Sequence, residues 1–124
     1  MIDAAEGALC AGWIMDAMHA DDAPIQLCCL LRARPGQEQA MTAYEDKVTA
    51  LVPEHGGELL SRVIGDGADG RPHEVHVYRF PNQPSLDAYM ADPRRLAMTD
   101  ERDRTVAATD LFPVIVAKQS GGTY

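Results

Sequence analysis

The amino-acid sequence predicts an α+β domain in which two helices cover one face of a four-stranded antiparallel sheet. Three observations predict this class. The segments follow one another in the order strand, helix, strand, strand, helix, strand. The two middle strands are joined by a short turn rich in glycine and aspartate, which is typical of a hairpin. The first helical segment carries its apolar residues on a single face, so it packs on a sheet from one side only.

Length, composition and charge limit the class of protein. A chain of 124 residues has the size of one domain. Its hydrophobic content of 46% and charged content of 24% are ordinary for a soluble globular protein, and its apolar runs are far shorter than the roughly 20 residues that cross a bilayer. A formal net charge of -8 disfavours binding to nucleic acid or to anionic lipid. We expect neither nucleic acid nor a membrane among its partners.

The cysteines and the first residues bear on the compartment. Cys10, Cys28 and Cys29 have no zinc-site spacing, and the adjacent pair would point to opposite faces of a strand, where the two thiols are poorly placed to form a disulfide. Acids at Asp3 and Glu6 stand where a secretory signal carries positive charge. We therefore expect no signal peptide, and a reducing, cytoplasmic location.

The first half of the domain is a strand followed by a helix. Residues 25–33, IQLCCLLRA, form a nearly continuous apolar run that predicts a strand, closed by an RPG turn. Over residues 37–54 apolar side chains recur at intervals of three and four, which predicts a helix that ends at Pro53 and at the HGG sequence 55–57. The apolar positions of this helix are Met41, Tyr44, Val48 and Leu51.

The middle of the domain is a predicted hairpin. Residues 58–64 (ELLSRVI) and 73–80 (HEVHVYRF) predict its two strands. The GDGADG turn between them lacks the lysine and the following helix of a phosphate-binding loop, so we interpret it as a connection only.

The last part of the domain is helical and then returns to strand. Ser85 is expected to cap a short helix, and Asp92 to cap another that has Pro93 at its first position and runs to about residue 107. The last strand is predicted over residues 110–118, in which Pro113 indicates a bulge or a sheet edge.

This order is the ferredoxin-like βαββαβ arrangement, a four-stranded antiparallel sheet with both helices on one face. The domain is predicted over residues 24–118. Residues 1–23 are predicted to be an N-terminal extension, either a short helix or disordered, and residues 119–124 a loose tail.

The second face of this sheet is predicted to be apolar as well. Alternation along the first strand places Cys28 and Leu30 opposite Leu27, Cys29 and Leu31. The last strand likewise has apolar residues on both faces. Two helices cover only one face, and a large exposed apolar patch is unusual on a soluble monomer. We therefore expect a homodimer, in which a second copy of the chain covers the open face.

Three stretches carry a resemblance to a known family. They are HGGELL at 55–60, VHVYRFPNQPSLDAYMADPRR at 75–95 and AATDLFPV at 107–114. Through them the chain resembles, over residues 24–118, the dimeric α+β barrel superfamily and its antibiotic-biosynthesis monooxygenase-like small proteins. The resemblance implies ferredoxin-like subunits whose sheets pair back to back, with a ligand cavity between each sheet and its helices. Members of the superfamily include cofactor-free oxygenases, isomerases, cyclases and haem-degrading enzymes.

The resemblance also implies where the candidate site residues lie. It places Phe80 at the point where relatives turn an aromatic ring into the cavity, and alternation then directs Glu74, His76 and Tyr78 the same way. Leu27 and Cys29 would line the neighbouring strand. By their helical spacing Tyr44 and Tyr89 lie on the inward faces of the two helices, where they would either cover a flat substrate or be plain core. The predicted ligand-binding residues are therefore Leu27, Cys29, Tyr44, Phe80 and Tyr89.

The HEVH sequence at 73–76 admits three interpretations. On a helix, His73 and His76 would be spaced to share a metal ion, but the alternating pattern favours a strand, and no second cluster completes a zinc site, so we expect no metal. On a strand, Glu74, His76 and Tyr78 share one face with about 7 Å between alternate side chains. His76 would then accept a proton from a substrate, Tyr78 would donate a hydrogen bond to the oxygen that gains charge, and Glu74 would orient the imidazole. The third interpretation is structural, with Glu74 at a solvated strand end and His76 a satisfied, half-buried residue.

Other reactive residue types are interpreted as structural. His55 suits the end of the first helix, and Cys29, which has no activating neighbour in the sequence, is interpreted as a small buried hydrophobe. The run of alternating charges over residues 92–104 is interpreted as a solvated helix face.

Together these observations predict a cytoplasmic homodimer with a small-molecule pocket in each subunit. The ligand is expected to be hydrophobic, aromatic or polyketide-like, and the chemistry to be proton transfer by His76 without metal or organic cofactor. Such chemistry serves an isomerase, a cyclase or a cofactor-independent monooxygenase. Two alternatives of the same fold stay open, a non-catalytic ligand-binding protein and a structural dimer whose cavity is filled by its own side chains.

Overall fold

A computed structural model describes residues 23–117 of the chain. The predicted extension over residues 1–23 lies outside the described residues except for its last residue, and the tail at 119–124 lies wholly outside them. Both therefore stay predictions.

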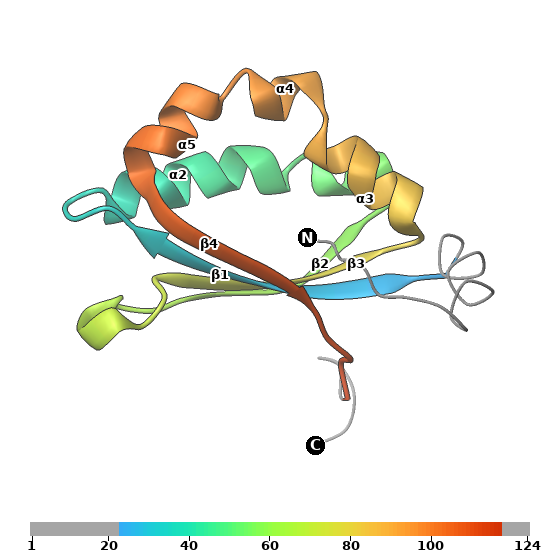
Figure 1. The fold of residues 1–124 in the computed structure, drawn as a ribbon, viewed down its shortest axis with the longest axis horizontal. Helices are drawn as coiled ribbons and strands as arrows, with labels where there is room; N and C mark the ends of the chain where they lie inside the picture. Colours follow the sequence, from blue (N-terminus) through green and yellow to red (C-terminus); the bar gives the residue numbers. More distant parts are fainter. Residues whose placement is uncertain (1–22, 118–124) are drawn as a thin grey trace, which may run out of the picture.

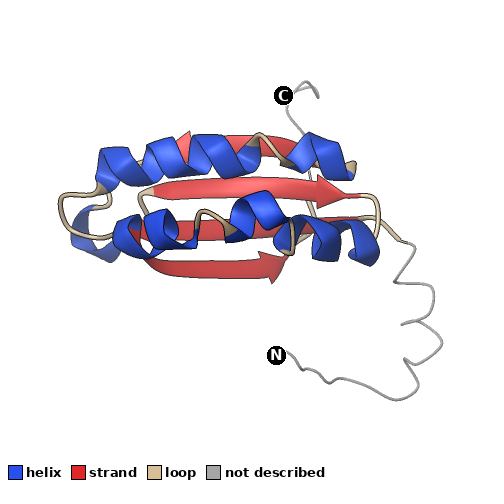
Figure 2. Ribbon diagram, turned by 90° about the horizontal axis from the view of Figure 1, so that it is seen from above, coloured by secondary structure: helices blue, strands red, loops and turns tan. Residues whose placement is uncertain are grey.

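Within the described part, one layer of helices covers one face of a sheet (Figures 1 and 2). The sheet is antiparallel with strand order β2-β3-β1-β4. The predicted α+β, ferredoxin-like class is confirmed. The strands are β1 (Ile25–Ala33), β2 (Glu58–Ile64), β3 (Glu74–Phe80) and β4 (Val106–Pro113). The helices are α2 (Glu38–Thr49), α3 (Gln83–Met90), α4 (Pro93–Leu96) and α5 (Thr99–Thr105), with 3-10 turns at Val52–His55 and Ala68–Gly70. None of the helices within residues 23–117 is long and apolar enough to span a bilayer.

The first helical segment is shorter than predicted and ends in a tighter turn. Instead of running to residue 54, α2 stops at Thr49, and Val52–His55 forms a 3-10 turn that contains Pro53. Gly56, with φ of 76°, closes that turn in the left-handed region, where glycine is favoured. A Cβ atom on Gly57 would lie 2.6 Å from the Phe80 ring, so glycine is required for β2 to start close to the core.

The capping and extent of the last helices also differ from the prediction. Asn82, not Ser85, caps α3, because its side-chain oxygen accepts a hydrogen bond of 2.8 Å from the Ser85 backbone N–H. Asp92 caps the helix that starts at Pro93, as predicted. That helix does not continue to residue 107: α4 ends at Leu96, and α5 follows as a separate helix.

The last strand starts and ends earlier than predicted. It runs over Val106–Pro113 rather than over residues 110–118, because pairing with β1 in the register Ala33↔Val106 to Leu27↔Pro113 extends the strand back over residues 106–109 (VAAT). Pro113 ends β4, which is an edge strand of the sheet. Of the two alternatives predicted for this proline, a bulge or a sheet edge, the structure shows the edge.

The core lies between the sheet and the helices. Met41, Val48, Val52 and Phe80 are almost completely buried there. On the opposite face the described residues provide no cover: Val63 and Phe112 are exposed. Cys28, Leu30, Val75 and Val77 on the same face are only half-buried. The predicted apolar character of this second face is therefore present in the folded chain.

Candidate functional site

Strand β3 holds a buried series of hydrogen-bonded polar side chains. Its alternation directs Glu74, His76 and Tyr78 toward the helices, and all three are buried. Nδ1 of His76 lies 2.8 Å from the Tyr78 hydroxyl, and Nε2 of His76 lies 2.7 Å from Oε1 of Glu74. Residues 74–76 of HEVH thus lie in the strand, His73 precedes it, and Glu74 is buried rather than at a solvated strand end.

Glu74 is held as a carboxylate by three neighbours. Burial raises the pKa of its carboxyl, but hydrogen bonds from His76, Arg62 and Thr42 outweigh burial and bring the pKa to about 2. Nε of Arg62 donates to Oε1 at 2.8 Å, and the Thr42 hydroxyl donates to Oε2 at 2.6 Å. An ionised carboxylate only accepts hydrogen bonds, so Nε2 of His76 carries a proton and donates it to Glu74.

The direction of the next hydrogen bond follows for a neutral ring. In a neutral imidazole one nitrogen donates and the other accepts. In a neutral His76 whose Nε2 donates to Glu74, Nδ1 accepts from the Tyr78 O–H. The lone pairs of the Tyr78 oxygen stay available to a ligand. Burial raises the pKa of the Tyr78 phenol strongly, so a free phenolate is disfavoured there.

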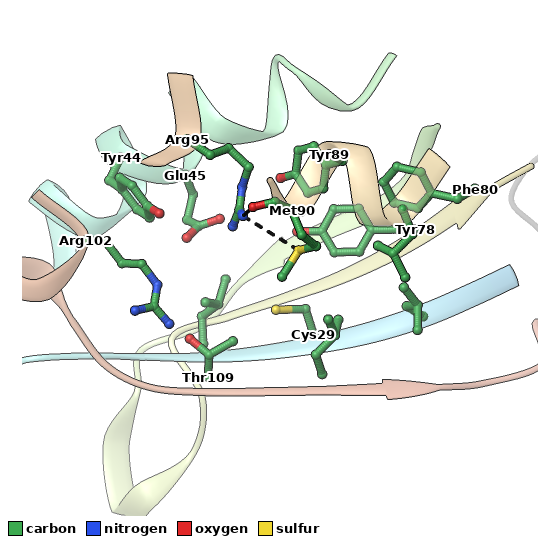
Figure 3. Close-up of a pocket in the computed structure, with 14 residues that line it drawn as sticks. Cys29, Tyr44, Glu45, Tyr78, Phe80, Tyr89, Met90, Arg95, Arg102 and Thr109 are labelled. Atoms are coloured by element: carbon green, nitrogen blue, oxygen red, sulfur yellow. Dashed lines mark hydrogen bonds between the residues drawn. The ribbon is translucent and has the colours of Figure 1, made fainter. Parts of the chain in front are cut away.

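A pocket of about 80 Å³ lies beside this series, between the sheet and the helices (Figure 3). It is partly open, and exposed Met90 and Leu111 are among its lining residues. Tyr78 lines the pocket, whereas His76 and Glu74 lie behind the lining. A ligand in the pocket therefore communicates with His76 and Glu74 through Tyr78 or its neighbours. All the residues predicted to bind a ligand are in the lining: Leu27, Cys29, Tyr44, Phe80 and Tyr89.

The sequence analysis missed Glu45, which also lines the pocket. Its side chain comes from α2, is only 5% exposed and places Oε1 3.9 Å from Nδ1 of His76. Burial raises the pKa of its carboxyl to about 7. His76 lowers this pKa and Glu74 raises it, each by less than burial does. The sequence did contain a sign that Glu45 is buried. Glu45 lies four residues after Met41 and three before Val48, so it falls on the buried face of the helix.

Arg95 and Arg102 were missed because their sequence pattern indicates exposure to solvent. Both belong to the run of alternating charges that was interpreted as a solvated helix face. In the structure both line the pocket, although Arg102 keeps an exposed side chain. That interpretation is therefore wrong for Arg95, because alternating signs indicate solvation on average and do not resolve which member of the run turns inward. Arg102 is exposed, as interpreted, and lines the pocket as well.

The other reactive side chains have structural surroundings. Burial raises the pKa of the Cys29 thiol to about 12, which makes it an unreactive, buried residue. Nε2 of His55 lies 2.8 Å from Oδ2 of Asp92, so it ties the 3-10 turn to the start of α4. Within residues 23–117, no three His, Cys, Asp or Glu side chains are grouped in a way that could hold a metal ion.

Comparison with known proteins identifies the fold. No protein-family model and no curated protein matches the sequence. A protein of unknown function from Rhodopseudomonas palustris matches the structure with a TM-score of 0.65 at 17% identity, covering 89% of this chain and 96% of that one. A protein from Bacteroides thetaiotaomicron, named as a candidate antibiotic biosynthesis monooxygenase, matches with a TM-score of 0.63 at 12% identity, covering 84% and 99%. A dimeric protein of unknown function from Bacteroides fragilis with a ferredoxin-like fold matches with a TM-score of 0.58 at 13% identity, covering 73% and 94%.

These neighbours are of the kind that the sequence resemblance implied, ferredoxin-like and antibiotic biosynthesis monooxygenase-like proteins. At such low identities they establish the fold of this chain and leave its chemistry to its own residues.

Proposed function

We propose that the chain binds a small apolar compound, aromatic or polyketide-like, and moves a proton on it with side chains alone. The reaction would be an isomerisation or cyclisation, or a cofactor-independent monooxygenation. The observation that carries this proposal is the unbroken hydrogen-bonded series from Glu74 through His76 to the Tyr78 hydroxyl, which ends at the pocket. A buried series of this kind, with a perturbed carboxyl beside it, is typical of acid/base sites.

The proton would leave the ligand through Tyr78. The Tyr78 oxygen accepts a proton from a ligand C–H or O–H while its own proton passes to Nδ1 of His76, 2.8 Å away. The resulting imidazolium is stabilised by the Glu74 carboxylate at 2.7 Å. Because the two transfers are coupled, the disfavoured free phenolate of Tyr78 need not accumulate. In this role His76 acts from behind Tyr78 rather than as the first proton acceptor.

Glu45 supplies the complementary acid. With a pKa of about 7, its carboxyl is partly protonated near neutral pH and can donate to the ligand oxygen that gains charge. Return of a proton to a different atom of the ligand completes an isomerisation or assists a ring closure. If the ligand carbanion instead reacts with dioxygen, its carbon forms a peroxide. Loss of a second hydrogen from that carbon as a proton, with cleavage of the O–O bond, then gives a carbonyl and one water, so the ligand CH2 group itself supplies the four electrons of this monooxygenation.

The pocket limits what is bound. Its volume of about 80 Å³ is small beside the several hundred Å³ of a drug-sized site, so the enclosed part receives the reacting group of a ligand. The rest of a larger molecule would extend through the open side past the exposed side chains of Met90 and Leu111.

A homodimer is part of the proposal. The open face of the sheet carries Cys28, Leu30, Val77 and Phe112, an apolar surface that no described element covers. A second copy related by a two-fold axis would bury it. The dimeric neighbour from Bacteroides fragilis supports this assembly. The cytoplasmic location stays a prediction, supported by the free thiols of Cys28 and Cys29.

Exchange of ligand hydrogen with solvent tests the proton transfer directly. The probes are 2-indanone, 2-tetralone and anthrone, three ketones with acidic C–H bonds, followed by NMR in deuterium oxide. Wild type should accelerate exchange of at least one probe, and Tyr78→Phe should lose most of that acceleration, about 100-fold or more. Tyr89→Phe is the comparison variant for loss of a lining hydroxyl as such: its ring still lines the pocket, but its hydroxyl donates to the Val48 carbonyl and is not part of the series, so Tyr78→Phe should lose far more of the acceleration than Tyr89→Phe.

A non-catalytic binding protein is the second candidate function. The observation that favours it is that both ring nitrogens of His76 already have partners inside the fold, so the series could serve only to fix Tyr78. Binding of a probe without accelerated exchange, equal in wild type and Tyr78→Phe, would establish this function and exclude the catalytic one. Absence of both binding and exchange would favour a structural dimer.

A further inference from the structure

We propose that the ligand of this pocket is an acid whose carboxylate is bound by Arg95, with Arg102 beside it. The inference rests on the proposed function, because it names the chemical class that the same pocket accepts. It comes from the two guanidinium groups, whose charges the proton-transfer chemistry does not use.

Arg95 is placed in the pocket and is incompletely satisfied there. Its guanidinium carbon lies 4.7 Å from the centre of the Tyr89 ring, a cation–π contact. One terminal nitrogen donates to the Met90 carbonyl at 3.1 Å. The Nε–H of Arg95 is buried and has no hydrogen-bond partner among residues 23–117. Figure 3 shows the guanidinium reaching from the helices to a position between Glu45 and Met90.

The adjacent Arg94 is an example of an arginine whose charge is paired within the fold. Arg94 turns the other way and is paired twice, with Oδ2 of Asp92 at 2.8 Å and with Oε1 of Glu54 at 2.8 Å. Arg95 has no ion pair with a carboxylate of residues 23–117. A buried donor left unpaired is expensive, and native proteins commonly reserve such a group for a ligand or water.

The charge of the pocket favours an anion. Arg102 adds a second guanidinium to the lining, and its one ion pair among the described residues is a long 3.8 Å contact with the adjacent Asp103. Among residues 23–117 the single carboxyl in the lining is Glu45, whose raised pKa leaves it only partly ionised near neutral pH. Two cations therefore face at most one anion.

A carboxylate fits this arrangement better than other anions of similar size. The guanidinium fork matches the two oxygens of a carboxylate in one plane, and the rest of the lining is aromatic and aliphatic. The apolar lining residues include Leu27, Leu31, Tyr44, Tyr78, Phe80 and Tyr89. An aromatic or aliphatic acid would place its charged end at Arg95 and its apolar body against these side chains.

Matched acids and amides test the inference. The probes are benzoate, 2-naphthoate and nonanoate, each paired with its primary amide, which has the same shape without the charge. Affinities are measured by isothermal titration calorimetry for wild type, Arg95→Gln, Arg95→Lys and Arg102→Gln. Arg104→Gln is the control, because Arg104 is an exposed arginine of α5 outside the lining, and its replacement changes the net charge equally.

We expect wild type to bind at least one acid tenfold or more above its amide. Arg95→Gln should remove that preference by weakening the acid about tenfold to 100-fold while leaving the amide within about twofold. Arg95→Lys keeps the charge without the fork and should give an intermediate loss. Circular dichroism checks that each variant is folded.

The outcomes separate this inference from the function it rests on. Equal binding of acids and amides, or a loss in Arg104→Gln equal to that in Arg95→Gln, would overturn the carboxylate site and leave the ligand pocket intact. Failure of every acid and every amide to bind would count against the ligand pocket itself, and with it against the carboxylate site.

Discussion

Replacing Glu45 by glutamine removes a carboxyl group whose ionisation is disfavoured by burial. The carboxyl is buried and lines the pocket, and within the described residues its nearest ionic partner is Nδ1 of His76 at 3.9 Å. Glutamine has nearly the same shape and does not titrate, so it removes the charge without opening a cavity. The titratable and charged groups that act on Glu45 or feel its charge are Cys29, Tyr44, Arg62, Glu74, His76, Tyr78, Tyr89 and Arg95.

The size and the sign of the effect follow from the pKa. The pKa of Glu45 rises from an ordinary 4.5 to about 7 on folding, which corresponds to roughly 3 kcal/mol. The folded state holds this proton more tightly than the unfolded chain does. The free energy of unfolding therefore falls as the pH rises from about 4.5 to about 7, and the full penalty is present above that range.

Urea unfolding at pH 4.5 and at pH 8 measures this penalty. Glu45→Gln and wild type should differ little at pH 4.5, and the variant should be more stable by up to about 3 kcal/mol at pH 8. Comparing the two proteins at each pH cancels the titration of the other acids. Glu58→Gln, which removes an exposed carboxylate from β2, is the control and should show no such dependence. A difference between variant and wild type that is the same at both pH values would refute the reasoning.

Two further predictions concern the partner of Glu74 and the open face of the sheet. Arg62→Met should lower the free energy of unfolding by about 3 kcal/mol at pH 7, because it leaves the buried Glu74 carboxylate without its cation; unchanged urea unfolding would show that Glu74 does not depend on Arg62. Val63→Lys should convert the proposed dimer to a monomer, because Val63 lies on the open face of the sheet. Ile64→Lys is the control and should leave the dimer intact, because Ile64 is equally exposed (both 55%) but lies on the helix-covered face. Light scattering measures the mass, and a dimer retained in Val63→Lys would contradict an interface on that face.

The strands and the pocket lining could be predicted because their signals are local. Each of the first three strands is bounded by glycine or proline, and its pattern extends over the whole element. Once β3 was predicted as a strand, period-two alternation placed Glu74, His76 and Tyr78 on one side, as the structure shows.

The features that were missed depend on contacts between distant segments. The start of β4, VAAT at residues 106–109, has no strand pattern of its own and becomes strand because β1 offers backbone groups to pair with it. Glu45 and Arg95 are charged, and charged side chains are expected in solvent unless the groups that surround them are known. The groups that surround Glu45 come from β3 and from α3, which are more than 25 residues away from it along the chain. The contacts of Arg95 with Tyr89 and Met90 are closer in sequence but form only once the chain turns between α3 and α4.

The composition of the buried cluster argues against a purely structural role. Glu74 is compensated by Arg62 and Thr42, but Glu45 has no hydrogen-bond partner for its side chain among residues 23–117, so its burial is a net penalty. Apolar residues of similar volume in such places are commonly neutral or stabilising by about 1–4 kcal/mol. A structural dimer gains nothing from the penalty, whereas a proton-transfer site gains an acid that titrates near neutral pH. A Glu45→Gln protein that is more stable at pH 8 and slower in hydrogen exchange of the probe ketones would separate these two roles in one variant.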